Sequence, residues 1–269
     1  MADPRMPEAF YKELEPHLPA EKPVGPKGGR PPHGHEIVVR VIWFVLVTGC
    51  RWQDVPLELG CSGRTAHRRL QAWQASGVWE QLHMHLLKLL HKVGEFDPHV
   101  AIIDGFTVRA FGGGDATGPS PVDRRKTGSK HTLLVDRHGV PAAIRTAGAN
   151  ASDHTQIIPL VLNFPHVSGK PGRPKELPDV AFADRSYDSD HTRALLSWLG
   201  VTPKIAKRKT PHGSGLGKVR WVVERTISWI KGLRRMRVRY DRLQSIQHAW
   251  NALAAAVICF RIAVHDCCS

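Results

Sequence analysis

Two apolar runs in this chain end in an aspartate, and a glutamate lies inside a strongly basic segment. The runs are His-Val-Ala-Ile-Ile-Asp104-Gly and Asp-Val-Ala-Phe-Ala-Asp184-Arg, and the glutamate is Glu224. A carboxylate that ends a buried strand is costly to desolvate unless it lies close to a cation. We therefore expect Asp104, Asp184 and Glu224 to gather around shared cations. The positive charge around Glu224 indicates that a phosphate backbone is another ligand of those cations.

Net charge is the unusual property of the composition. The 269 residues include 38 Lys and Arg against 24 Asp and Glu, which gives a net charge of +14. The stretch 204–242 holds 13 of the basic residues and only two acids, Glu224 and Asp241, so it contributes +11. Such an excess predicts a polyanionic partner, a nucleic acid before a membrane. A solvated basic surface is the alternative explanation of the same counts.

No segment of the sequence indicates export or a membrane anchor. The N-terminus is rich in Pro and Glu and lacks an apolar leader. The apolar runs 37–47 and 252–262 are too short to cross a bilayer. The five cysteines form no CxxC pair and, being odd in number, suggest no disulfide framework. We expect a cytoplasmic protein that is associated with the nucleoid and has no membrane partner.

Residues 1–95 are predicted to form an all-α DNA-binding domain with a basic arm, rich in Pro and Gly, at 19–34. A helix over 36–48 and a short helix near 54–59 lead to the turn Gly60-Cys61-Ser62. Ser62 can cap a helix that runs to about Ala75.

Helix, tight turn and second helix are typical of a helix-turn-helix motif. The second helix would present Arg64, His67, Arg68 and Arg69 to solvent, in the manner of a helix that lies in a major groove. Ala66, Leu70 and Trp73 would face inward. A plain helical bundle with a basic face is the alternative.

Residues 96–269 are predicted to form an α/β domain. The expected strands are 99–109, 130–136, 140–147, a run ending at 184, and 201–206; the expected helices are 150–163, 189–199, the helix of Glu224, and 244–264. Three strands followed by alternating helices and strands predict a mixed five-stranded sheet with helices packed on it, like that of ribonuclease H. The first strand would lie beside the strand of Asp184, so that both aspartates reach one edge.

The helix around Glu224 has a narrow polar ridge. At 100° per residue, Arg220, Glu224, Ser228 and Lys231 lie on one side. The expected apolar stripe opposite them consists of Val219, Val222, Thr226, Trp229, Ile230 and Leu233. A lone Glu between cations is usually a surface ion-pair partner of little energetic weight, and the two strand-end aspartates are the reason to prefer a catalytic role.

Three carboxylates on a rigid frame suit Mg²⁺ or Mn²⁺ better than Zn²⁺. Two such ions can activate an attacking oxygen and stabilise the leaving one in phosphoryl transfer. Arg220 and Lys231 would hold phosphates or steady Glu224. The basic loop residues expected to grip a DNA backbone nearby are Arg124, Arg125, Lys126 and Lys130. Trp221 would either stack on an unpaired base or pack in the core.

Two further acids of this region, Asp136 and Asp153, are expected to have local structural roles, at a hairpin turn and at a helix start.

The chain resembles the DDE transposases of bacterial insertion sequences, in the insertion-sequence-four and -five grouping. The N-terminal segments that carry the resemblance are Gly29-Arg30-Pro31, 48–56, 71–73 and 77–79; the C-terminal ones are Ile103-Asp104, 128–139, Asn150 with Asp153, and 183–188. The Arg-x3-Glu-x6-Lys signature of that family is met by Arg220, Glu224 and Lys231. Gly217 stands where the family usually has a tyrosine.

The resemblance implies a catalytic triad of Asp104, Asp184 and Glu224 on a ribonuclease H-like fold. It implies an enzyme that frees a 3′-hydroxyl at each transposon end and joins it to target DNA. The N-terminal region would recognise terminal inverted repeats, and a homodimer is expected when DNA is bound. A non-enzymatic DNA-binding regulator or inactive relic, and a nuclease without strand transfer, are the alternatives.

Overall fold

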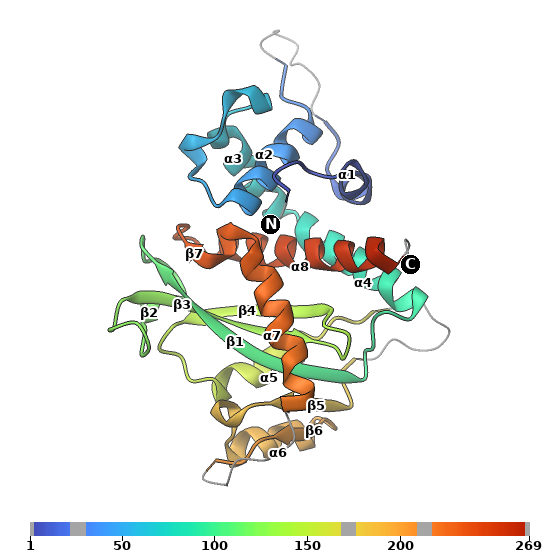
Figure 1. Ribbon diagram of the computed structural model, residues 1–269, viewed down its shortest axis with the longest axis vertical. Coiled ribbons are helices and arrows are strands. Elements are labelled where there is room, and N and C mark those ends of the chain that lie inside the picture. The colour runs from blue at the N-terminus through green and yellow to red at the C-terminus, as the bar shows by residue number, and fades with distance from the viewer. Residues whose placement is uncertain (1–2, 22–30, 168–175, 209–216, 267–269) are drawn as a thin grey trace.

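The computed structural model describes residues 3–21, 31–167, 176–208 and 217–266. Parts of the expected basic arm and of the loop before Asp184 lie outside these ranges. The N-terminal helices are α1 (Glu8–Leu14), α2 (His35–Thr48), α3 (Gly63–Ala75) and α4 (Val78–Val93). They form the upper part of the molecule in Figure 1, with α4 running down to the sheet region. The sequence did not predict α1, whose Phe10 and Leu14 are fully buried.

The helix α3 begins as predicted, because the Ser62 hydroxyl accepts a hydrogen bond from the Thr65 amide at 3.3 Å. A side chain on Gly63 would lie 1.8 Å from the Trp52 carbonyl oxygen, so only glycine fits this close approach. Ala66, Leu70 and Trp73 are buried as expected. The short helix expected near 54–59 is instead two 3₁₀ turns, Trp52–Asp54 and Leu57–Leu59.

The central strand of the sheet is β1 (Val100–Ala110). On one side it pairs antiparallel with β3 (Thr127–Val135), which pairs antiparallel with β4 (Pro141–Gly148). On the other side it pairs parallel with β5 (Val180–Ala183), which pairs parallel with β6 (Thr202–Ile205). Three antiparallel strands that continue into three parallel ones, sharing β1, are the sheet of a ribonuclease H-like fold. The predicted fold class is confirmed.

Within the described residues the sheet has seven strands and not five. The additional strands are β2 (Gly118–Pro119), which pairs with β3, and β7 (Val238–Arg239), which pairs with the end of β1. Each contains two residues, which is too short for an alternating pattern to be visible in the sequence.

Helices cover both faces of the sheet. Phe106 and His131 are cross-strand neighbours with stacked rings, and the Lys231 ammonium of α7 (Gly217–Gly232) lies 5.0 Å from the Phe106 ring, so this face is the one that α7 covers. Gly105 faces the opposite way, toward the Tyr187 hydroxyl. Figure 1 shows α7 crossing in front of β1, with α5 (His154–Leu162) and α6 (Asp190–Trp198) lower in the view.

The last helix, α8 (Gln244–Asp266), is longer than the apolar run 252–262, which was expected to be too short to cross a bilayer. By length and composition its residues Gln244–Val264 would be able to cross a bilayer. However, 72% of its most apolar window is buried inside the fold. Packing against α4 and β4 makes it a core helix.

A buried arginine connects α8 to the N-terminal helices. The Arg235 guanidinium donates to Asp241 at 2.9 Å and to the Cys50 carbonyl at 3.3 Å. It also lies 5.7 Å from the ring of Trp52 and 5.4 Å from that of Trp250. Because Cys50 and Trp52 follow α2 and Trp250 belongs to α8, these contacts join segments far apart in the chain. The division into domains at residues 95 and 96 stays a prediction.

We expect Arg235→Leu to lower the free energy of unfolding by about 3–5 kcal/mol in urea, because it leaves the Asp241 charge buried without its cation. The Arg235 and Asp241 side chains are 2% and 7% exposed. Arg40→Ala, which removes an exposed helical arginine, is the matched control and should cost under about 1 kcal/mol. Adding Asp241→Asn to Arg235→Leu should restore part of the loss. Unchanged stability in Arg235→Leu would contradict this role.

Candidate active site

The register of the sheet brings the two predicted aspartates to the same level. Ile102 pairs with Phe182 across the parallel strands β1 and β5, and Asp104 and Asp184 each lie two residues further along. Asp104 Oδ1 accepts a hydrogen bond from the Gly105 amide at 2.8 Å. Asp184 Oδ1 accepts from the Ser186 amide at 2.8 Å and from its hydroxyl at 2.5 Å. These bonds hold one oxygen of each carboxylate, and the second oxygen of each lies near the Arg220 guanidinium.

A single guanidinium nitrogen occupies the space between the three acids. Arg220 Nη2 donates to Asp104 Oδ2 at 2.9 Å and lies 3.6 Å from Glu224 Oε1 and 3.8 Å from Asp184 Oδ2. No two of these oxygens can therefore be further apart than 7.4 Å, the sum of the two longer distances. The structure brings together the acids that the sequence singled out.

Exposure differs among the three acids. The side chains of Asp104, Asp184 and Glu224 are 16%, 30% and 58% exposed, so the site opens toward Glu224. Burial raises the pKa of the Asp104 carboxyl, and hydrogen bonds from Gly105 and Arg220 offset this only in part. Burial lowers the pKa of Arg220, but the bond to Asp104 and the nearby acids raise it on balance.

Two polar atoms beside the acids have no hydrogen-bond partner among the described residues. They are the Tyr187 hydroxyl and Arg220 Nε, both buried. The Tyr187 oxygen would lie 3.1 Å from a side-chain carbon at Gly105, the residue after Asp104. Burial, followed by the charges of Asp104 and other acids, raises the pKa of this hydroxyl well above its usual range. Tyr187 therefore remains a neutral donor, and no pattern in the sequence pointed to it.

The three carboxylates fit a divalent cation by donor type, because oxygen ligands suit Mg²⁺ and Mn²⁺. In the described part of the chain, however, no three His, Cys, Asp or Glu side chains are already placed as a set of metal ligands. The acids surround Arg220 instead. The guanidinium supplies the positive charge that such a cluster requires, and it would have to move for a cation to bind all three oxygens.

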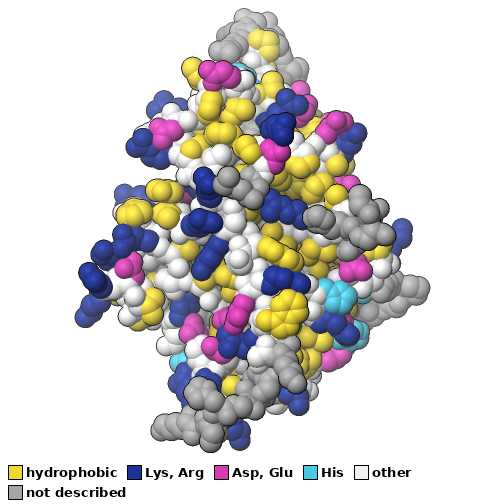
Figure 2. All heavy atoms as spheres, viewed as in Figure 1, with side chains coloured by type: hydrophobic (Ala, Val, Ile, Leu, Met, Phe, Trp, Pro, Cys, Tyr) yellow, Lys and Arg dark blue, Asp and Glu magenta, His cyan; other side chains and the backbone are white. Residues whose placement is uncertain are grey.

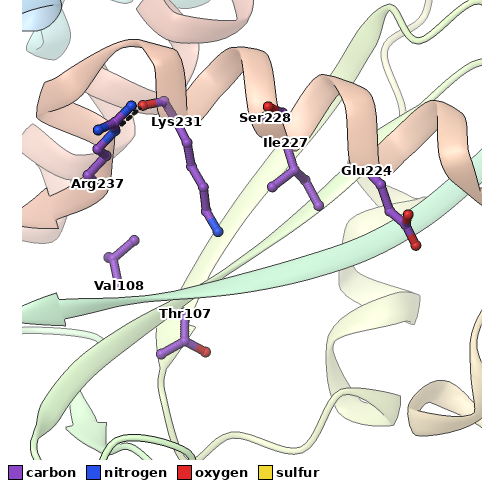
Figure 3. A pocket seen from close by; sticks show the side chains of 7 residues that line it. All are labelled: Thr107, Val108, Glu224, Ile227, Ser228, Lys231 and Arg237. Atoms are coloured by element: carbon purple, nitrogen blue, oxygen red, sulfur yellow. Dashed lines mark hydrogen bonds between the residues drawn. The ribbon is translucent and has the colours of Figure 1, made fainter.

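An open pocket of about 570 Å³ extends from Glu224 between α7 and β1. Its other lining residues are Thr107, Val108, Ile227, Ser228, Lys231 and Arg237. Figure 3 shows Lys231 extending from α7 toward β1, with Glu224 further along the helix. Arg237 donates to the Lys231 carbonyl at 2.6 Å, which fixes it at the opposite end from Glu224. Two cations and two hydroxyls thus line a pocket that leads to the acids.

The predicted polar ridge of α7 lies partly against β1 and does not point fully away from the core. Arg220 and Lys231 are half-buried, and Glu224 and Ser228 are exposed. Trp229 was expected in the apolar stripe, but it is 36% exposed, so this prediction is wrong. The Arg225 guanidinium lies 4.6 Å from its ring and 4.8 Å from that of Trp221, which is 51% exposed.

The other cations expected to contact DNA have different surroundings. On α3, Arg64 and Arg68 are exposed and Arg69 is half-buried. His67 was expected to face solvent. That prediction is wrong, because its ring lies 5.1 Å from that of Trp52. In the loop before β3, Arg124, Arg125 and Lys126 are exposed. Figure 2 shows Lys and Arg side chains gathered along the left edge of the molecule, over β2 and β3.

Lys130 is not available to a phosphate. Its ammonium donates to Asp153 and to the Ala151 carbonyl, each at 2.6 Å, and its side chain is 12% exposed. This ion pair explains Asp153 as a structural acid, as predicted. Asp136 is structural too, because its carboxylate accepts hydrogen bonds from the amides of Asp97, His138 and Val140.

Comparisons with known proteins show the family of the chain. A family model described as "Transposase DDE domain" matches residues 95–259, more than half of the chain. A second model, described as "Putative transposase of IS4/5 family", matches residues 6–83. The chain belongs to the DDE transposases of insertion sequences.

Two curated relatives of this transposase come from Burkholderia cepacia. "Putative transposase for insertion sequence element IS402" is 47% identical over 144 residues, which cover 54% of this chain and 68% of the relative. "Insertion element IS402 uncharacterized 16.2 kDa protein" is 42% identical over 123 residues, covering 45% of this chain and 84% of the relative.

Among solved structures, "Crystal structure of the Mos1 mariner paired end complex with Mn" is 12% identical. The match has a TM-score of 0.36 and covers 94% of this chain and 81% of that one.

We expect Arg220→Ala to bind Mn²⁺ about tenfold more tightly than the unmodified protein in the absence of DNA, since it removes a positive charge from the centre of three acids. Free Mn²⁺ measured by electron paramagnetic resonance gives the affinity. The variant should also melt at a lower temperature in EDTA, because the carboxylates then repel one another. Arg40→Ala is the control. Equal Mn²⁺ affinities in Arg220→Ala and the unmodified protein would show that Arg220 does not compete with the cation.

Proposed function

We propose that this transposase cleaves DNA at the ends of its insertion sequence and joins the freed 3′-hydroxyl to target DNA. The observation that carries the proposal is the approach of Asp104, Asp184 and Glu224 to one nitrogen atom. An acid cluster of this kind at two interior strands of the sheet, beside a pocket lined by cations, suits a phosphodiester substrate.

Asp104, Asp184 and Glu224 would together hold two divalent cations, Mg²⁺ or Mn²⁺. When bound, such cations activate the attacking oxygen and stabilise the leaving one in phosphoryl transfer. The hydrogen bonds to Gly105 and Ser186 orient the two aspartates and reduce the reorganisation that binding requires. Arg220, released from Asp104, is close enough to the acids to reach a phosphate oxygen of the strand.

Lys231 and Arg237 would position the strand in the pocket beside Glu224. Both cations line it, and Thr107 and Ser228 add hydroxyls that can donate to phosphate oxygens. Arg124, Arg125 and Lys126 would extend the phosphate contacts beyond the pocket. Trp221 is half-exposed on α7 and would stack on an unpaired base.

The region 1–95 would recognise the terminal inverted repeats through α3. Arg64 and Arg68 are exposed on it, and Ala66, Leu70 and Trp73 anchor its other side in the core. The helix is therefore fixed while its cations remain free to enter a major groove. We infer that two copies assemble on paired ends, and that the protein works at the nucleoid in the cytoplasm, where its substrate lies.

Two variants test the division of labour between the regions. Asp104→Asn should abolish cleavage of a duplex that carries the inverted repeat bordering the gene, while its affinity for that duplex stays within about twofold, because binding rests on phosphate contacts. Arg68→Ala should weaken binding of the same duplex by about 5- to 100-fold and leave the cleavage rate at saturating protein unchanged. Electrophoretic mobility shifts and end-labelled cleavage with Mg²⁺ measure both quantities.

Each variant is the control for the other. Joined products with supercoiled target DNA identify a transposase, whereas nicking alone identifies a nuclease. Binding without any cleavage by the unmodified protein would identify a regulator or an inactive relic. If Asp104→Asn loses binding as completely as cleavage, the assignment of the chemistry to the three acids is wrong.

A further inference from the structure

Two aromatic side chains lie exposed side by side where β1 and β7 end. Phe111 follows β1 directly and is 64% exposed; Tyr240 follows β7 and is 42% exposed. Their ring centroids are 6.2 Å apart and their planes differ by 27°, so the rings are stacked. Large apolar rings exposed as a pair on a strongly charged protein indicate a binding surface. We call this pair the aromatic platform.

The platform is built on a fixed backbone. The Asp115 amide donates to the Arg242 carbonyl at 3.0 Å, which ties the loop after Phe111 to the segment after Tyr240. Gly114 has a φ of 107°, and a side chain there would lie 2.2 Å from that carbonyl oxygen, so the close approach requires glycine. The two backbone segments that carry the rings are therefore joined before any ligand arrives.

Cations surround the platform. An open groove of about 450 Å³ beside Phe111 is lined by Arg109, Ala110, Phe111, Arg125, Lys126 and Thr127. The Arg109 guanidinium lies 5.3 Å from the centre of the Phe111 ring and is held by Asp123 at 3.1 Å. Arg125 and Lys126 are exposed. This charge complements a polyanion and disfavours an apolar protein partner.

The turn that carries these cations is conformationally costly. Arg124 and Arg125 have φ angles of 47° and 59°, in the left-handed region that favours glycine. The turn is closed by hydrogen bonds from Arg125 to the Ser120 carbonyl and from Lys126 to the Asp123 carbonyl. Arginine at two such positions points to a use for its guanidinium, since glycine would adopt the turn more easily.

We propose that the groove binds one unpaired nucleotide of the DNA substrate. Its base stacks on Phe111 at the aromatic platform, and its phosphate is held by Arg125 and Lys126. Every base has a π-face, so stacking accepts any sequence, whereas a base inside a duplex has no face free. This inference rests on the proposed function and adds that the DNA is distorted at this place.

The distance from Asp104 to the platform follows from the length of β1 between them. Phe111 is seven residues beyond Asp104, six of them along β1, which spans about 20–23 Å at the rise of a strand. A DNA strand advances about 3.4 Å per nucleotide. The stacked nucleotide is therefore expected about six nucleotides from the phosphate that reacts at the acids.

The test uses a 30-base-pair duplex with a central three-nucleotide bulge containing 2-aminopurine, and the same duplex fully paired, both in EDTA. The unmodified protein should quench the 2-aminopurine fluorescence and bind the bulged duplex more tightly. Phe111→Ala should lose the quenching and bind the bulged duplex roughly 5- to 150-fold more weakly. Its affinity for the paired duplex should stay within about twofold.

Phe111→Tyr keeps the ring and should behave as the unmodified protein. Trp198→Ala is the matched control, because Trp198 is an aromatic residue that is 81% exposed and belongs to α6, the helix at the bottom of Figure 1. Tyr240 is left unchanged, since the buried Arg235 lies 5.1 Å from its ring. Circular dichroism melting checks that each variant folds.

If Phe111→Ala weakens binding of both duplexes equally, or of neither, the proposed role of the aromatic platform is wrong. If the platform fails in this way while the unmodified protein still binds and cleaves end DNA, the proposed function stands without it. Absence of binding to either duplex by the unmodified protein would overturn the proposed function and the platform together.

Discussion

Three carboxylates can share a half-buried site only if a positive charge lies among them, because like charges repel strongly where water is scarce. In this protein Arg220 supplies that charge from within the same helix as Glu224. The strands β1 and β5 fix the two aspartates by register, and α7 must cross β1 so that its arginine and glutamate meet them. The position of α7 on the sheet is thus set by electrostatics as well as by its buried face.

The central strand carries most of the features that we connect with DNA. Asp104 lies near its start, Thr107 and Val108 line the pocket beside Glu224, and Arg109 leads to the platform at Phe111. Because Asp104, Thr107, Val108 and Arg109 share this strand and Phe111 follows it directly, their spacing along the chain does not depend on a flexible loop. The N-terminal helices are joined to this frame through the contacts of Arg235, so α3 also has a defined position.

Much of this arrangement could be predicted from the residues alone. Asp104 and Asp184 each end an apolar run, and Ser62 and Ser189 cap the helices that follow them. Asp184 follows the end of β5 as expected, but the expected strand end at Asp104 is wrong, because β1 continues to Ala110. What sequence patterns do not contain is tertiary register. Trp229 has the spacing of a core residue but lies under Arg225, and Lys130 looks like a free cation in a basic loop until Asp153 is found beside it. The bridging position of Arg220 could not be predicted, because it depends on three elements meeting at one point.

The most direct measurement is an anomalous difference map from crystals of the protein soaked with Mn²⁺. We predict a peak within about 2.5 Å of carboxylate oxygens from Asp104 and Asp184, with Glu224 in its first or water-mediated shell and the Arg220 guanidinium moved off Asp104. Peaks only at other acids would contradict a shared cation site. So would an unaltered contact between Arg220 and Asp104, with no metal among the three acids, at Mn²⁺ concentrations far above millimolar.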